Sequence, residues 1–170
     1  RVIDSDHEDV AAYHGYLTKG LRGRSLVADI TPAYALLTEP ALSRIAALEV
    51  NLSCPNLEGR SGIIAHDPSL AGQIVSAVCA RSQVPVWAKL SANTDRIVEV
   101  ATTVSDAGAS AVTVMNTMLG MQIDVRTSRR SLGNGGGGLS GPAIRPIAVR
   151  AVHDIRVALP GIAIVGVGGI

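Results

Sequence analysis

The densest group of side chains capable of chemistry is the segment 51–56, Asn-Leu-Ser-Cys-Pro-Asn, which follows an apolar run. Its two amides, Asn51 and Asn56, each offer a hydrogen-bond donor and an acceptor, which suits a planar ligand with several carbonyl and N–H groups. A cysteine thiol becomes a base or a nucleophile when its pKa is lowered, so Cys54 is a candidate for either role. The residues alone give equal support to an alternative, in which Cys54 is a small buried side chain in the turn at Pro55 and has no chemical role.

Three more polar side chains follow apolar runs farther along the chain. Lys89 is one of only two lysines, against thirteen arginines, and it stands near the end of the run 84–90. Because a buried ammonium group needs a partner, we expect Lys89 to face an anionic or polarised group rather than simply to reach solvent. Asn116 and Thr117 follow the run 111–115 in the same strand-end position, where they are placed to contact the same ligand.

Glycine-rich turns flank the last expected helix, at 138–142 (GLSGP) and 166–169 (GVGG). Backbone N–H groups at such turns bind phosphate, so the pair indicates a phosphate-bearing cofactor, with tight-turn geometry alone as the alternative. The G-x-G-x-x-G match at 133–138 is not a dinucleotide fingerprint, because no strand precedes it. The four histidines show no metal-ligand spacing, so we predict no metal site.

The elements that must position these side chains alternate between strand and helix. The chain has five short apolar runs that are typical of buried parallel strands, at 25–30, 48–52, 84–90, 111–115 and 162–167. Helices are expected at 41–47, 68–81, 95–107 and 146–159, with Asp67, Asn93-Thr94 and Gly108 as capping signals. The polar, glycine-rich segment 126–138 predicts a long loop.

This order predicts an α/β fold with a parallel sheet, either an open doubly wound sheet or a closed (βα)8 TIM barrel. Asn51, Lys89, Asn116 and Gly168 stand at or just past the ends of four successive strands, where barrel enzymes build their sites, so we favour the barrel. Residues 1–170 hold five expected strands, and a barrel usually needs about 250 residues. We therefore expect a single incomplete barrel domain over 1–170, about strands 3 to 7, lacking its first and last strands.

Composition excludes several classes of partner. The net charge is +1 and aromatic residues make up 2% of the chain, so neither nucleic acid nor an anionic membrane surface is an expected partner. No apolar run approaches the roughly 20 residues of a membrane span. The two cysteines, Cys54 and Cys79, argue against a disulfide scaffold and favour a reducing cytoplasm, and Cys79 has the spacing of a core residue on a helix.

The motifs NLSCPN, AKL, MNT, GGLSGPAIRP and GVGGI resemble those of the flavin-binding dihydroorotate dehydrogenases, in the same order and at about the same spacings. The resemblance covers about residues 48–170. It implies a (βα)8 barrel with FMN at its C-terminal rim and the oxidation of dihydroorotate to orotate in pyrimidine biosynthesis. It does not extend to the N-terminal strands of the family or to the final strand, whose Gly-Thr turn completes the phosphate site.

The resemblance also implies roles for individual residues. Cys54 matches the base that removes the C5 proton of dihydroorotate while a hydride passes from C6 to the flavin. Asn51, Asn56, Asn116 and Thr117 match residues that bind the pyrimidine, and Asn51 also lies near the flavin. Flavin contacts are implied for Lys89, Met115, Gly141, Gly168 and Gly169. The segment 57–66, with Gly59 and Gly62 as hinges, is placed to act as a lid over Cys54.

The branch and its partners follow from the same resemblance. Membrane-bound, quinone-using members have a serine base where Cys54 stands, so the cysteine indicates the soluble class 1. The MNT and GGLSGPAIRP forms resemble its NAD-linked 1B branch, which pairs with a subunit carrying FAD and an iron–sulfur cluster; a homodimer is a further expected assembly. Three alternatives stay open: fumarate as electron acceptor, a related dihydropyrimidine dehydrogenase or reductase, and a flavin- or phosphate-binding barrel without turnover. Dihydropyrimidine dehydrogenases have their catalytic cysteine in the lid, and the stretch 64–67 contains none.

Overall fold

The computed structural model describes residues 46–53, 64–133 and 136–170. Its centre is a parallel sheet in the order β1-β2-β3-β8, formed by β1 (Leu48–Asn51), β2 (Val86–Lys89), β3 (Ala111–Val114) and β8 (Ala163–Gly166). These strands agree within two residues at each end with four of the five expected runs. The strand expected at 25–30 lies outside the described residues.

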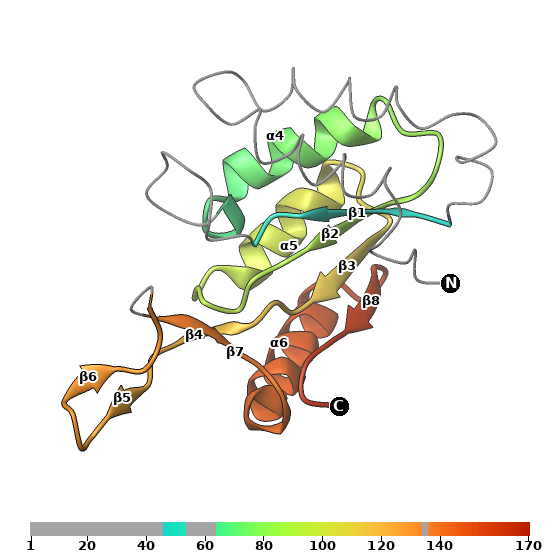
Figure 1. Ribbon diagram of the computed structural model, residues 1–170. Coiled ribbons are helices and arrows are strands. Elements are labelled where there is room, and N and C mark those ends of the chain that lie inside the picture. Colours follow the sequence, from blue (N-terminus) through green and yellow to red (C-terminus); the bar gives the residue numbers. More distant parts are fainter. Residues whose placement is uncertain (1–45, 54–63, 134–135) are drawn as a thin grey trace.

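Three helices connect these strands: α4 (Pro68–Cys79), α5 (Ile97–Asp106) and α6 (Arg145–Ala158). Short 3-10 turns, η1 (Ile64–His66) and η2 (Pro142–Ile144), precede α4 and α6. The helices pack in chain order, α4 against α5 and α5 against α6, on the same side of the sheet (Figure 1). Because the strands are added in one direction and parallel crossovers are right-handed, α4, α5 and α6 all lie on one face, as in a barrel and unlike a doubly wound sheet.

The two faces of the sheet differ in character. Val86 and Ala88 on β2 are 3% and 0% exposed and belong to the hydrophobic core, whereas Trp87 and Lys89 between them are half-buried. Since side chains alternate along a strand, Trp87 and Lys89 project from the face opposite the helices. The register pairs Lys89 with Asn51 and with Thr113, so these three side chains share that face.

The N-cap of α4 and the C-terminal cap of α5 are those predicted from the sequence. The Asp67 side chain accepts a hydrogen bond from the Leu70 N–H at 3.1 Å, and proline follows at the first helical position, as predicted. Gly108 has φ +104°, and the N–H groups of Gly108 and Ala109 donate to Ser105 and Val104 in the pattern of a Schellman cap. Helix α4 ends at Cys79, two residues before the predicted end.

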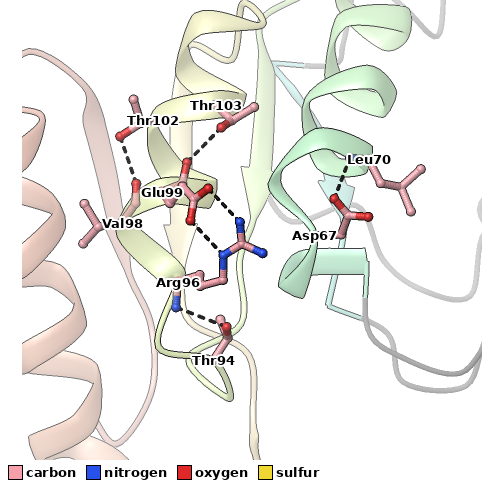
Figure 2. A network of polar contacts seen from close by, with 8 residues as sticks. All are labelled: Asp67, Leu70, Thr94, Arg96, Val98, Glu99, Thr102 and Thr103. Atoms are coloured by element: carbon pink, nitrogen blue, oxygen red, sulfur yellow. Dashed lines mark hydrogen bonds and ion pairs between the residues drawn. The ribbon is translucent and has the colours of Figure 1, made fainter.

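The predicted Asn93-Thr94 cap of α5 is wrong. The helix begins at Ile97, and its N-cap residue, Arg96, makes no side-chain capping bond. Instead the Thr94 hydroxyl accepts from the Arg96 N–H in a turn before the helix, and the Arg96 guanidinium binds both carboxylate oxygens of Glu99, at 2.7 and 2.8 Å (Figure 2). Glu99 in the first turn also interacts favourably with the helix dipole.

The segment 126–138, predicted as a long loop too polar for a packed element, contains paired strands. It contains β6 (Arg129–Arg130), which pairs antiparallel with β5 (Ile123–Asp124), and the start of β7 (Gly137–Leu139), which pairs with β4 (Met118–Gly120). These two ladders form an arm that projects from the sheet (Figure 1). Polar side chains do not prevent strand pairing here, because the pairing uses backbone groups and the arm is largely exposed.

Several predicted features lie outside the described residues. They are Cys54, Asn56 and most of the expected lid, including Gly59 and Gly62. The described end of the lid, Ile64–His66, forms η1, whose Ile64 and Ala65 are buried in the core. Most of the helix expected at 41–47 is also outside, and its described end, residues 46–47, is not helical.

Candidate functional site

The polar residues predicted from strand ends gather at one edge of the sheet. Asn51 and Lys89 are the last residues of β1 and β2 and are paired in register. Asn116 follows β3 by two residues, and Gly168 follows β8 by two. Because all four strands are parallel, their carboxyl ends meet at the same edge, and we call this edge the rim. In α/β sheets the rim is the usual place for a ligand.

Ser53 lies at the centre of a hydrogen-bond network at the rim. Its N–H donates to Oδ1 of Asn51 at 3.1 Å, and its hydroxyl lies 3.2 Å from the same Oδ1 and 3.1 Å from the carbonyl oxygen of Lys89. Its own carbonyl accepts from Nδ2 of Asn116 at 3.0 Å. Ser53 is 1% exposed whereas Asn51 is exposed, so these bonds are partly buried, and they connect the ends of β1, β2 and β3.

The backbone at the rim extends this network beyond the strands. The Lys89 carbonyl also accepts from the Leu52 N–H at 3.2 Å, and the Asn116 N–H donates to the Leu90 carbonyl at 3.0 Å. The Met115 N–H donates to the Val167 carbonyl, which ties the end of β3 to the residues that follow β8. The predicted site residues Asn51, Lys89 and Asn116 are therefore positioned by one continuous set of bonds.

Asn93 performs a related role for the loop that follows β3. Its Nδ2 donates to the Thr117 carbonyl at 2.9 Å and to the Ser91 hydroxyl at 3.1 Å, and its Oδ1 accepts from the Leu119 N–H at 2.7 Å. It thus fixes the backbone at Thr117 and the start of β4. Gly138 approaches this place so closely that a Cβ there would overlap the Thr117 side chain, which explains why glycine stands in β7.

Three glycines with positive φ lie beside the start of α6, at the rim. Gly141, Gly168 and Gly169 have φ values of +79°, +119° and +77°. A Cβ at Gly141 would meet no atom within 4 Å, whereas one at Gly169 would lie 2.8 Å from the backbone nitrogen of Arg145. Arg145 begins α6, and its Nε donates to the Gly169 carbonyl. Open space at Gly141, positive-φ glycine turns and the nearby guanidinium of Arg145 fit a phosphate group.

The face of the sheet below the rim is charged. Lys89 is half-buried there. Glu49 lies on the same face of β1, two residues before Asn51, the partner of Lys89 in the register. The Thr113 hydroxyl, which is 3% exposed, donates to Oε2 of Glu49 at 2.6 Å across β2. The face therefore offers an anchored carboxylate and a lysine to whatever lies against it. Sequence reasoning did not single out Glu49 or Thr113.

Cys79 lies outside the rim and agrees with its prediction as a core residue. It is half-buried against the core beside Gly108, and burial raises the pKa of its thiol above the ordinary value. His153 is exposed on α6, where Arg150 and His153 pair with Asp154 and lower the pKa of that carboxyl. His66, at the described end of the expected lid, has Nε2 buried with no hydrogen-bond partner among the residues that the structure describes.

Two searches of the described residues found nothing. Within 46–53, 64–133 and 136–170, no three His, Cys, Asp or Glu side chains gather closely enough to bind a metal ion. In the same ranges no helix is both long and apolar enough to cross a membrane.

Sequence reasoning missed Ser53, Asn93 and Arg145 as residues that shape the site. Ser53 lies inside the recognised NLSCPN motif, and its position between an amide and a thiol was the available signal. Asn93 was interpreted as part of a helix cap. Arg145 stands in the GGLSGPAIRP motif, but its contact with Gly169 depends on a turn 24 residues away.

Known proteins resemble this chain over most of its length. The dihydroorotate dehydrogenase family profile matches residues 23–170. Curated relatives named "Dihydroorotate dehydrogenase B (NAD(+)), catalytic subunit" from Listeria innocua, Bacillus pumilus and Exiguobacterium sibiricum are 43%, 45% and 46% identical over 126 residues. Each match covers 74% of this chain and 40–41% of the relative. The chain therefore spans about two fifths of the length of these relatives.

Solved structures show the same fold. A DHODH from Eimeria tenella in complex with ferulenol matches with a TM-score of 0.64 and 20% identity, over 88% of this chain and 44% of that one. Its ligand-free form matches with a TM-score of 0.63. At this identity the likeness concerns the fold alone. It confirms the predicted fold class, because the parallel strands and the helices on one face are a portion of an α/β barrel.

Proposed function

The chain belongs to the dihydroorotate dehydrogenase family, and from that premise we propose that the protein of which it is a part oxidises dihydroorotate to orotate with FMN as cofactor. The observation that carries the proposal is the convergence of Asn51, Lys89 and Asn116 around Ser53 at the rim of a partial barrel. These are the strand ends at which barrel enzymes bind substrate and cofactor.

The proposed base is Cys54, which directly follows Ser53 in the chain. In its thiolate form it accepts the proton from C5 of dihydroorotate while the C6–H bonding pair leaves as hydride, so that a C5–C6 double bond forms. FMN, when bound, supplies the acceptor for that hydride. A free thiol has a pKa of about 8.5, so the site must stabilise the thiolate for proton transfer near neutral pH.

The substrate is an anionic, planar ring with carbonyl and N–H groups. We assign its binding to Asn51, Asn56, Asn116 and Thr117, with Asn116 also fixing the backbone before Cys54 through the Ser53 carbonyl. An amide suits this ring because it offers both a donor and an acceptor.

For FMN we assign the ring to Lys89, Asn51 and the Met115 backbone, and the phosphate to the glycines. Gly141 supports this assignment most directly, because the space where its Cβ would point is open. Gly168 and Gly169 turn the backbone after β8 toward the same end of α6. The half-buried ammonium of Lys89 suits the polar edge of a flavin ring, which becomes more electron-rich on reduction.

The names of the curated relatives support a finer proposal about the electron acceptor and the partner. They are called catalytic subunits of an NAD(+)-linked enzyme. We assign this protein to the same 1B branch, with NAD as terminal acceptor, a second subunit carrying FAD and an iron–sulfur cluster, and a homodimer of the catalytic chain. The reducing cytoplasm is the compartment that fits a catalytic thiol.

A comparison of the full-length wild type with Cys54→Ala and Cys54→Ser tests the function. All three should bind FMN, since the glycines and Lys89 are unchanged. Dihydroorotate should reduce the flavin of the wild type at neutral pH, Cys54→Ala should be slower by at least about a hundredfold, and Cys54→Ser should regain rate as the pH rises. A wild type that binds FMN but is reduced only by another dihydropyrimidine, or by none, would contradict the proposal.

A further inference from the structure

We propose that Ser53 is a positioning residue that sets the orientation of the Asn51 amide, so that Asn51 presents its NH2 group to the bound ligand. This inference rests on the proposed function, in which the ligand is dihydroorotate or orotate. The NH2 side of the Asn51 amide then meets the ligand, and Ser53 determines that orientation.

The orientation follows from the two donors of Ser53. The Ser53 N–H lies 3.1 Å from Asn51 Oδ1, and the Ser53 hydroxyl lies 3.2 Å from the same atom. An amide N–H only donates, so the Asn51 atom that faces it must be the oxygen. Turning the amide over would bring its NH2 group against the Ser53 N–H and would lose the bond.

With Oδ1 occupied, the Nδ2 of Asn51 faces away from Ser53. Asn51 is exposed at the end of β1, on the face of the sheet that also carries Lys89. Among the described residues, none accepts a hydrogen bond from this Nδ2. Because Nδ2 only donates, the ligand atom that meets it in the proposed complex is a hydrogen-bond acceptor.

The chemistry of the ligand agrees with this polarity. Dihydroorotate and orotate carry two ring carbonyls and a carboxylate, all of which are acceptors. An NH2 group opposite one of them forms a bond, whereas an amide oxygen opposite the same atom would be repelled and left without a donor. The orientation of one amide therefore contributes to substrate discrimination.

Ser53 is held firmly enough to impose the orientation. Its side chain is buried, and its hydroxyl also lies 3.1 Å from the Lys89 carbonyl. A hydroxyl has one hydrogen, which these two acceptors share. The Ser53 carbonyl is in turn bound by Asn116. A substitution at Ser53 should therefore affect ligand binding through Asn51, and it should affect the stability of the rim through Lys89.

The test is a double-mutant cycle on the full-length holoenzyme, with the dissociation constant of orotate measured by calorimetry and the melting temperature measured in parallel. Ser53→Ala removes the hydroxyl but keeps the backbone N–H as a donor to Asn51 Oδ1, so orotate binding should weaken by about threefold, less than the effect of losing both donors. In an Asn51→Ala background the same change should alter the dissociation constant by less than about twofold, because there is no amide left to orient.

Two further variants sharpen the result. Asn51→Asp keeps an oxygen for Ser53 but places an acceptor where the NH2 group stood, and should weaken orotate binding by at least about tenfold. Ser82→Ala is the matched control, because the Ser82 hydroxyl also donates to a backbone carbonyl, that of Val84, before β2 at the opposite end of the sheet. It should lower the melting temperature without changing the dissociation constant.

The outcomes separate this inference from the function on which it rests. Equal effects of Ser53→Ala with and without the Asn51 side chain, or full binding by Asn51→Asp, would overturn the inference while leaving the function standing. A Ser53→Ala variant that behaves like Ser82→Ala would do the same. A wild type that neither binds orotate nor is reduced by dihydroorotate would overturn the function and the inference together.

Discussion

Replacing Gly169 with alanine should destabilise the protein by about 2–5 kcal/mol. This cost has two parts, one from the backbone conformation and one from overpacking, and variants at two other glycines separate them. Gly169 has φ +77°, a conformation that costs an L-residue about 1–2 kcal/mol. A Cβ there would also lie 2.8 Å from the backbone nitrogen of Arg145 and 2.9 Å from its Cα. Because backbone at the start of α6 cannot rotate away as a side chain would, overpacking adds about 1–3 kcal/mol.

Gly141→Ala and Gly161→Ala separate the two contributions. Gly141 has φ +79° and ψ −167°, a region adopted almost only by glycine, but nothing lies within 4 Å of its Cβ position. Its replacement should therefore cost only the conformational part, about 1–3 kcal/mol. Gly161 has open space without a positive φ, and its replacement should change stability by less than about 0.5 kcal/mol. The assay is urea unfolding of the full-length protein stripped of flavin.

The order of the three variants decides the matter. We expect Gly169→Ala to be the least stable and Gly161→Ala the most stable. If Gly141→Ala were as destabilising as Gly169→Ala, the close approach of Arg145 to the turn after β8 would not exist. The FMN affinity of Gly141→Ala adds an independent reading, because its methyl group would enter the space assigned to the phosphate and should weaken binding despite the modest stability loss.

Three other predictions concern the helices. Asp67→Ala should cost about 0.5–2 kcal/mol of unfolding free energy because it removes the N-cap of α4, while Ser69→Ala in the same exposed turn should cost less than about 0.5 kcal/mol. The hydrogen bond from Arg96 lowers the pKa of Glu99, so the stability that this pair adds is fully present above the ordinary glutamate pKa of about 4.3 and is lost as the pH falls through the lower folded value. Unfolding of wild type and Glu99→Gln from pH 7 to pH 2 should show their difference vanish at the acid end, and a constant difference would contradict the assignment. Cys79, whose thiol pKa is raised by burial, should react with iodoacetamide at pH 8 more slowly than glutathione, as measured by peptide mass spectrometry; an equal rate would refute the burial argument.

The parallel strands and their helices could be predicted because their signals are local. The run 111–115 is apolar except for Thr113, as is typical of a buried parallel strand, and β3 is buried along its whole length. Asp67 before Pro68 and Gly108 after α5 are capping signals whose structural reasons act within a few residues. For these elements, sequence and structure differ by only one or two residues at the ends.

The arm was not predictable in the same way. Arg129 and Arg130 form a strand only because Asp124 and Ile123 lie opposite them, and no apolar pattern records such a pairing. In the same way, Asn93 looks like a cap residue in the sequence, whereas its partners lie 24 and 26 residues away. Local reasoning fails where tertiary contacts decide which hydrogen bond a polar side chain makes.

The same distinction between local signals and tertiary contacts applies to the residues of the candidate site. The position of Asn51, Lys89 and Asn116 at the rim could be predicted because each ends or follows a recognisable strand. The role of Ser53 could not, since its bonds to the Lys89 carbonyl and from the Asn116 side chain span 36 and 63 residues. The sequence predicts two glycine turns around α6, but only the structure distinguishes the open space at Gly141 from the close contact at Gly169.

The most direct measurement for the central claim is an anaerobic titration of the full-length holoenzyme with dihydroorotate. Absorbance would report the oxidised flavin, and chromatography would report the product. We predict that the yellow absorbance of the flavin is lost and that one orotate forms for each flavin reduced. Flavin that stays oxidised in excess dihydroorotate, in a protein that is folded and fully loaded with FMN, would contradict the claim that this rim is a dihydroorotate-oxidising site.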